Sequence, residues 1–160
     1  MTSGDTMNLL VEAMPFLSAA GLALFVGALL TEAIVLVPMW RTLQPQEFFT
    51  LHAAHAHRLY KFFAPLTASA TVLAVVAAVT SLASGHSGRV ASAVAAALAL
   101  VILSTYFLYF RRANAGFAEA SITHEELPAE LARWAAWHWF RPAIGLVALA
   151  ATLLALRGGA

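Results

Sequence analysis

The sequence predicts an all-α integral membrane protein, a four-helix bundle built from two antiparallel transmembrane hairpins. Of its 160 residues, 61% are hydrophobic and only 11% are charged, whereas about a quarter of a soluble domain is charged. The mean hydropathy is +0.79, and the apolar residues fall into four separate stretches. These observations exclude a water-soluble globular enzyme, and the length predicts a single domain over residues 1–160.

Each apolar stretch is long enough to cross the membrane as one helix. The stretches cover residues 16–40, 62–84, 90–110 and 134–156, with at most one charge in each. A helix needs about 20 residues to cross the hydrocarbon core. The first stretch follows acidic rather than basic residues, so we expect it to be retained as a span and not cleaved as a signal peptide.

The helices are expected to be longer than their apolar parts. Pro45 suits a first helical position, so the second helix is predicted to run from Gln46 to Ser84. Residues 111–120 extend the third helix, and Thr123 and Glu126 form a capping box that opens the fourth. All four helices are therefore expected to project beyond the bilayer on the same, cytoplasmic side.

The basic residues predict the orientation. Only Arg89 and Arg157 lie toward one end of the four helices, and by the positive-inside rule the other, basic end is cytoplasmic. The N- and C-termini are then on the non-cytoplasmic side of a multi-pass protein. The seven basic residues of the cytoplasmic end are Arg41, Arg58, Lys61, Arg111, Arg112, Arg133 and Arg141.

Net charge and cysteine content exclude further classes. A formal net charge of +1 provides no basic surface for nucleic acid. Because the chain has no cysteine, it has no disulfide, thiolate ligand or thiol nucleophile. A metal ion would need His, Asp or Glu side chains.

Glu32 is the most informative residue, because it lies inside an apolar span, where an ionisable group favours a functional role. The alternative is a protonated or paired carboxyl group that only fixes helix packing. Counting residues from the ends of each helix predicts one polar layer at the depth of Glu32. Its members are Glu32, His55, Arg58, Lys61, Tyr109, Asn114, His138 and Arg141.

The histidines raise the possibility of a metal site. His52 and His55 lie about 60° apart on one helical face, and with Glu32 and His138 they form a donor set suited to zinc, iron or copper. The alternative is the polar face of a protruding helix. We favour this alternative because neither a His pair spaced i, i+4 nor a Glu-x-x-His motif occurs.

Aromatic and cationic residues gather at the start of the fourth helix. All four tryptophans lie at the cytoplasmic end, as an interfacial belt or as walls of a pocket. His138 and Arg141 are three residues apart and share a face that an anionic or phenolic ligand could contact. Arg111 and Asn114 repeat this spacing, and Trp137 and Arg111 are candidate cofactor-binding residues.

Four motifs follow one another along nearly the whole chain. They are Glu32-x5-Pro38-Met-Trp40-Arg41-Thr-Leu43-x3-Glu47-Phe48-Phe49, Phe62-Phe63-Ala-Pro65-Leu66, Asn114 after a basic pair, and Trp134-x2-Trp137-His138-x2-Arg141. In these motifs the sequence resembles the anthrone-oxygenase-like family of small four-span membrane proteins. The resemblance implies oxidation of anthrones to anthraquinones by dioxygen without a dedicated cofactor, with Glu32, Asn114, His138 and Arg141 at the site. The histidines of the second helix are not assigned by the resemblance, and they leave a His/Glu-bound transition metal or haem open.

Two functions are therefore expected. The first is an oxidoreductase or oxygenase that acts on an aromatic or phenolic substrate in a cytoplasm-facing pocket. The alternative is a noncatalytic accessory subunit of a larger membrane complex, or a homo-oligomer, because small residues in the first three spans permit close helix packing.

Overall fold

The computed structural model describes residues 3–157, with side chains from Val11 onward, and within them every regular element is a helix. Residues 1–2 and 158–160 of the predicted domain lie outside the described residues. The elements are α1 (Ser3–Thr31), η1 (Glu32–Leu36), α2 (Val37–Trp40), α3 (Pro45–Ala83), α4 (Arg89–Thr105), η2 (Tyr106–Phe110), α5 (Arg111–Ala118) and α6 (Leu127–Arg157).

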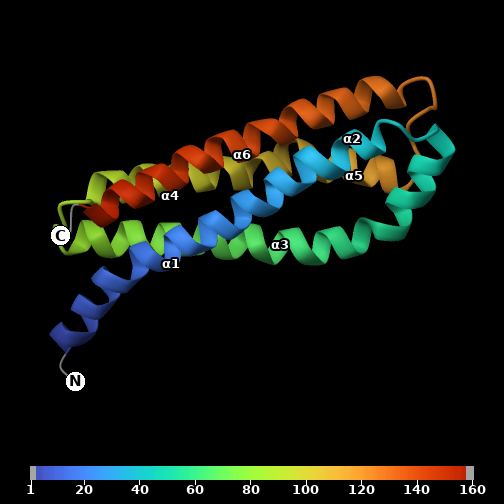
Figure 1. Ribbon diagram of the computed structural model, residues 1–160. Helices are drawn as coiled ribbons and strands as arrows, with labels where there is room; N and C mark the ends of the chain where they lie inside the picture. The colour runs from blue at the N-terminus through green and yellow to red at the C-terminus, as the bar shows by residue number, and fades with distance from the viewer. Residues whose placement is uncertain (1–2, 158–160) are drawn as a thin grey trace.

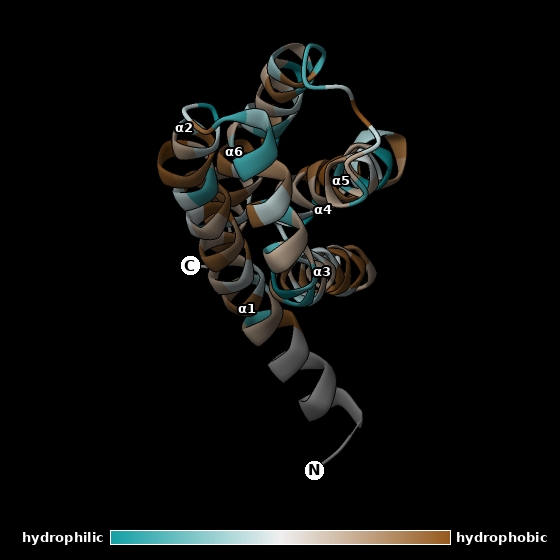
Figure 2. Ribbon diagram, turned by 90° about the vertical axis from the view of Figure 1, so that its right-hand side faces the viewer, coloured by the Kyte–Doolittle hydropathy of each residue, from teal (hydrophilic) through white to brown (hydrophobic). Residues whose placement is uncertain are grey.

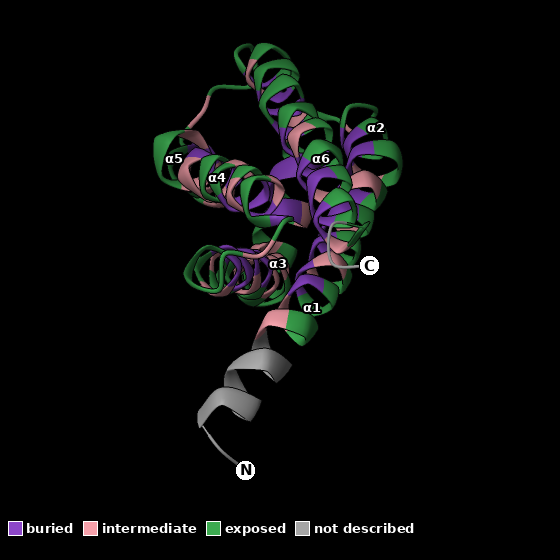
Figure 3. Ribbon diagram, turned by 90° about the vertical axis from the view of Figure 1, so that its left-hand side faces the viewer, coloured by how far each residue is buried: buried purple, intermediate pink, exposed green. Residues whose placement is uncertain are grey.

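Four helical rods are long and apolar enough to cross a membrane: Val11–Trp40, Pro45–Ala83, Arg89–Ala118 and Leu127–Arg157. The predicted all-α, four-span fold is thereby confirmed. The second, third and fourth rods continue beyond their predicted apolar segments at the end that carries the 41–44 and 119–126 loops. The expectation that all four helices extend there is wrong for the first rod, which stops at Trp40 where the chain turns and is longer only at its other end. Figure 3 shows that buried faces point inward and exposed faces outward. The outward faces are apolar too, with Leu24 69% and Leu108 74% exposed, which suits a lipid surround.

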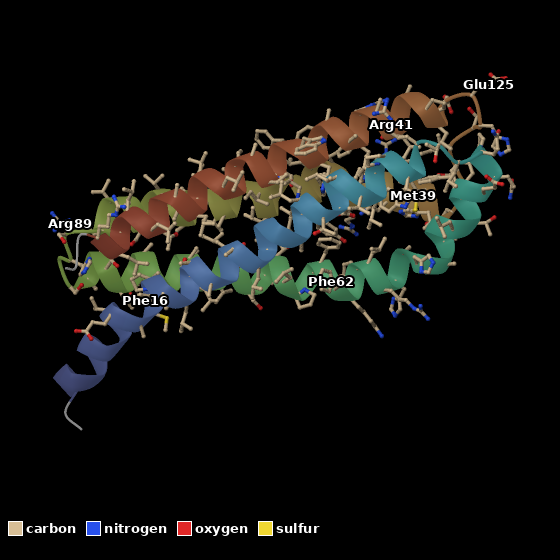
Figure 4. All side chains as sticks on the ribbon, in the orientation of Figure 1. Phe16, Met39, Arg41, Phe62, Arg89 and Glu125 are labelled. Carbon is tan, nitrogen blue, oxygen red and sulfur yellow. The ribbon has the colours of Figure 1, made fainter. Side chains whose placement is uncertain are left out.

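The rods form a closed square in chain order. α1 packs against α3, α3 against α4, α4 against α6, and α6 against α1 (Figure 1). α1 begins and α6 ends at one end of the bundle. The opposite end carries the 41–44 and 119–126 loops, and we call it the polar end. Hydrophilic segments gather there (Figure 2), and Figure 4 places Arg41 and Glu125 there and Arg89 at the other end.

Capping residues determine where two helices begin. Gln44 caps α3, its backbone N–H donates to Glu47 at 3.1 Å, and Pro45 is the first helical residue. Before α6, the Thr123 hydroxyl donates to Glu126 at 2.8 Å and accepts from the Glu126 N–H at 3.3 Å. The predicted capping box is confirmed, although the regular helix begins only after one further turn.

The core changes composition along the bundle. Away from the polar end, small side chains let the helices approach closely, and at the polar end a cluster of aromatic rings fills the interior. The small residues include Ala74, Ala78, Ala96 and Ala99, and the aromatic residues include Trp40, Phe48, Phe110, Phe117 and Trp134. The bundle is therefore narrow through its apolar half and wide enough for larger groups at the polar end.

Two rods are interrupted by π-helical turns, η1 and η2. The Val37 N–H bonds to the Glu32 carbonyl, and the Arg111 N–H to the Tyr106 carbonyl, each five residues back. Such turns insert an extra residue, widen the helix and often mark functional sites. Here they lie on the first and third rods, around the cavity described next.

Candidate functional site

A cavity of about 480 Å³ lies between α3 and the η2–α5 segment, with part of its wall from the first and last rods. This volume is in the range of small-molecule sites. Pro65 lies inside α3 beside the cavity, and η2 forms the facing wall, so neither wall is a fully regular α-helix. Aromatic walls come from Trp40, Tyr60, Phe63, Tyr106, Phe107, Phe110 and Trp134, and polar groups from Glu32, His52, Thr67, Arg111, Asn114 and Arg141.

Glu32 and His138 form a buried pair. Glu32 is 5% exposed and His138 is fully buried, and 3.7 Å separates Oε2 of Glu32 from Nδ1 of His138. Nε2 of His138 lies 3.0 Å from the Leu29 carbonyl oxygen. A carbonyl only accepts hydrogen bonds, so Nε2 carries the proton and Nδ1 is directed at the Glu32 carboxyl group. The pair can hold one further proton, on either the carboxyl group or Nδ1.

Aromatic packing fixes the His138 ring. The Trp134 indole stacks on it with 4.9 Å between ring centroids and 6° between planes, and Phe110 meets it edge to face. The Trp134 N–H donates to Oδ1 of Asn114 at 2.9 Å. Indole is only a donor, so this bond identifies the Asn114 oxygen and leaves its amide NH₂ available as a donor.

Arg141 is a buried cation without a close partner. It is 8% exposed and lines the cavity, and its Nε has no hydrogen-bond partner. No ion pair in residues 3–157 includes it, although it interacts electrostatically with Glu32. Its guanidinium lies 4.8 Å from the Phe110 ring centre. A buried unpaired charge is costly, so this geometry favours an anionic ligand in the cavity.

The proposed metal ligands are only partly brought together. Glu32 and His138 contact each other, and His52 is buried in the cavity wall. His55 is exposed and lies along a second hollow that includes Arg58. No group of three His, Asp or Glu side chains in the described part of the chain is placed to hold a metal ion. The inward face of α3 passes through His52, and three further residues rotate His55 out of it.

The two candidate cofactor-binding residues, Arg111 and Trp137, are separated, and Tyr109 and Lys61 of the predicted polar layer lie apart from the cavity. Arg111 lines it and is exposed, whereas Trp137 stacks on Tyr109 with 5.3 Å between centroids. The Tyr109 hydroxyl donates to Glu130 at 2.7 Å, and Lys61 is exposed on the surface. Glu32, Asn114 and Arg141 therefore line one cavity. His138 is not among its lining residues and contacts Glu32 from within the bundle, and Trp137 lies apart from all four.

Tyr60 and Tyr106 were not expected at the site, yet both line the cavity. The signal for Tyr60 is its spacing, because His52, Ala56 and Tyr60 follow one another at four-residue intervals on one face of α3. Tyr106 has no comparable signal, because its place in a π-helical turn cannot be read from residue spacing.

The chain matches no protein-family model, no curated protein and no solved structure. The resemblance to the anthrone-oxygenase-like family accordingly rests on the short motifs of the sequence.

Proposed function

We propose that the protein is a membrane oxidoreductase that binds an aromatic, phenolic substrate in this cavity and oxidises it with dioxygen. The observation that carries the proposal is Arg141, a buried cation without a close partner in an aromatic-lined cavity beside the Glu32–His138 pair. The resemblance of the sequence motifs to the anthrone-oxygenase-like family supports the same chemistry.

The cavity suits a flat substrate with an acidic oxygen. Rings of Tyr60, Tyr106 and Phe110 provide aromatic surface on several sides. A phenolate or enolate oxygen placed against Arg141 would offset the buried positive charge. The amide NH₂ of Asn114 supplies a second donor to that oxygen. Donors already in position for a developing oxyanion are a strong source of catalysis.

The Glu32–His138 pair supplies the base. In an anthrone, the ring CH₂ carbon loses a proton to this pair, and Arg141 stabilises the resulting enolate. Dioxygen then oxidises the electron-rich carbon. One oxygen atom becomes the new carbonyl, the second leaves as water with the two hydrogens of the CH₂ group, and the four electrons removed from carbon reduce dioxygen.

The test is dioxygen uptake and quinone absorbance with an anthrone-type phenol and the purified protein in nanodiscs. Glu32→Gln and Arg141→Gln are expected to lower kcat/KM by about a hundredfold or more, the usual effect of losing one acid–base group or oxyanion donor. Glu125→Gln and Arg112→Gln make the same chemical changes at exposed positions and should leave the rate unchanged.

The proposal fails if the wild-type protein neither binds such phenols nor takes up dioxygen, or if Glu32→Gln retains full activity. An inactive protein that copurifies in mild detergent with a stoichiometric larger partner would instead favour the accessory-subunit function.

A further inference from the structure

We infer that the substrate is a membrane-dissolved amphiphile, an acidic phenolic ring with a hydrocarbon chain, and that it reaches the cavity sideways from the lipid between α3 and the η2–α5 segment. This inference rests on the proposed function, since it specifies the substrate of the same site. Four observations support it: the side on which the cavity is open, the depth of that opening in the membrane, the change from polar to apolar residues along the cavity wall, and the aromatic residues around the opening.

The cavity opens on one side of the bundle. Its exposed lining residues are Tyr60 and Ala68 of α3, Phe107 of η2, and Arg111 and Ala115 of α5. Its lining residues from the first and last rods are all buried, and these are Glu32, Trp40, Trp134 and Arg141. The opening therefore lies between the second and third rods and faces the surroundings of the bundle.

The depth of the opening places it where hydrocarbon meets lipid headgroups. At 1.5 Å per residue, Tyr60 is about 35 Å along α3 from Ala83. Phe107 is about 27 Å along the third rod from Arg89. The hydrocarbon core is about 30 Å thick. If α3 and α4 meet at one membrane surface, Tyr60 and Phe107 lie on either side of the opposite boundary of the core.

The lining of the cavity is amphiphilic along the same direction. Toward the polar end it includes His52, Arg111 and Asn114, and toward the membrane centre Ala68 and Leu103. The stretch from His52 to Ala68 corresponds to about 24 Å of helix. At the same rise per residue Arg141 lies about 24 Å along α6 from Arg157, close to the depth of Ala68, which is about 22 Å from Ala83. An elongated molecule fits the cavity with its acidic ring against the buried Arg141 and its chain leaving past the exposed Ala68 into the hydrocarbon.

The rim of the opening is aromatic where it meets the lipid. The Tyr60 and Tyr106 rings face each other across it with 6.4 Å between centroids, and Phe107 is 65% exposed. Tyrosine is enriched at membrane interfaces. Arg111 lies on the polar-end side, where a cation attracts anionic headgroups. An opening used from water would expose these apolar side chains to the aqueous phase.

The experiment closes the opening reversibly. Because the chain has no cysteine, Tyr60→Cys with Tyr106→Cys provides the only two thiols. A bifunctional methanethiosulfonate reagent can join them, since each cysteine thiolate displaces a methanesulfinate group and forms a disulfide that a reductant cleaves. Trp137→Phe and Trp139→Phe are added so that fluorescence reports only Trp40 and Trp134, which line the cavity. The probes, added to nanodiscs in a stopped-flow instrument, are a bromophenol with a dodecyl chain and the same bromophenol without it.

Cross-linking is expected to slow tryptophan quenching by the dodecyl probe at least tenfold, and cleavage of the cross-link by the reductant should return the quenching rate to its value before cross-linking. The reference rate is that of the same double variant before cross-linking. Tyr60→Cys alone is the control for the reagent, and its treated and untreated forms should be quenched at the same rate as each other. Ala68→Phe, which narrows the opening without cross-linking and adds no tryptophan, should also slow quenching by the dodecyl probe.

Unchanged quenching by the dodecyl probe after complete cross-linking would overturn lateral access while leaving the proposed function intact. Faster binding of the chainless probe than of the dodecyl probe, insensitive to the cross-link, would do the same. Failure of both probes to quench before cross-linking would contradict phenol binding and the proposed function with it.

Discussion

The His138 side chain is held by packing and a hydrogen bond on one side and contacts the Glu32 carboxyl group on the other. Its Nε2 is bound to the Leu29 carbonyl, its ring is stacked on Trp134, and its Nδ1 faces Glu32. The ring thus has one orientation and one free nitrogen. If the Glu32–His138 pair is the base that we propose, this packing keeps its proton-accepting atom in a fixed place, as efficient proton transfer requires.

The Trp134–Asn114 hydrogen bond is expected to stabilise the wall of the site. Trp134→Phe keeps an aromatic ring against His138 but removes the N–H donor, leaving Oδ1 of Asn114 without this partner. Loss of a hydrogen bond of this kind costs about 1 kcal/mol. Thermal unfolding in detergent should show the loss. Trp139→Phe, at a 46% exposed position, is the control, and equal destabilisation by the two changes would contradict the prediction.

At the residue level, the depth of each polar side chain along its helix was predictable from the sequence, but the direction in which the side chain points was only partly predictable. Counting residues placed Glu32, His138 and Arg141 at one level because a helix rises by a constant amount per residue. The same count included His55 and Arg58, which lie around a separate hollow. Which face of α3 points inward depends on packing against the other rods, and the mixed apolar and polar start of α3 does not reveal it.

At the level of elements, the contact between α1 and α6 depends on one glycine. A Cβ atom added to Gly145 would lie 2.6 Å from Cγ2 of Val26. Val26 is 3% exposed, and a β-branched side chain in a helix has one strongly preferred rotamer. Gly145→Ala is therefore expected to destabilise the fold by about 1–3 kcal/mol through overpacking.

Gly27→Ala is the matched control for this prediction, because nothing lies within 4 Å of a Cβ atom at that position of α1. It should stabilise the fold by up to about 1 kcal/mol through better helix propensity. Thermal unfolding of both variants in the same detergent measures the difference. A Gly145→Ala protein as stable as Gly27→Ala would show that the two helices are not in close contact there.

The capping box before α6 predicts a pH dependence. Hydrogen bonds from the hydroxyl and backbone N–H of Thr123 hold the pKa of Glu126 below its usual value near 4.5. A lowered pKa means that the ionised form stabilises the folded turn above the unfolded-state pKa, and that this stabilisation is lost as the pH falls through the lowered value.

Carboxyl-carbon NMR of the full chain in micelles measures this pKa directly. Thr123→Ala removes the hydroxyl donor but keeps the backbone N–H, so the Glu126 midpoint is expected to move upward toward its usual value. A midpoint that does not move in Thr123→Ala would show that the hydroxyl does not hold the carboxylate in solution.

The four long helices were predictable, whereas the two π-helical turns were not. Apolar length and the Pro45 and Thr123 signals place the ends of α3 and α6 within a few residues of those observed. The turn at Glu32 and the turn at Tyr106 have no such signal, because one inserted residue leaves the local apolar pattern intact. Both turns contribute residues to the cavity wall, Glu32 from η1 and Tyr106 from η2.

At the level of the whole molecule, the two halves of the bundle differ in how their interiors are packed. Alanine-rich packing closes the half away from the polar end, while aromatic side chains and the cavity occupy the other. Polar groups that could bind or react therefore lie near one membrane surface. Which membrane surface this is determines the side from which the proposed substrate would reach the cavity.

The excess of Lys and Arg at the polar end predicts that this end is cytoplasmic. Two exposed serines allow a matched test, Ser84 after α3 and Ser121 before α6. Each hydroxyl makes one bond to a nearby backbone carbonyl, at 3.2 Å and 3.5 Å, and Ser→Cys is nearly isosteric. In a chain without other cysteines, each variant carries one thiol, and the two thiols lie at opposite ends of the bundle.

Intact cells treated with a membrane-impermeant maleimide should be labelled at Ser84→Cys, and labelling at Ser121→Cys should require permeabilised cells. The opposite pattern would place the polar end outside the cytoplasm and reverse the predicted orientation. Labelling of both thiols in intact cells would contradict a fully spanning bundle, because the two loops would then share one side. The expected pattern would place the cavity opening in the cytoplasmic leaflet, where anionic lipids are concentrated and Arg111 would meet them.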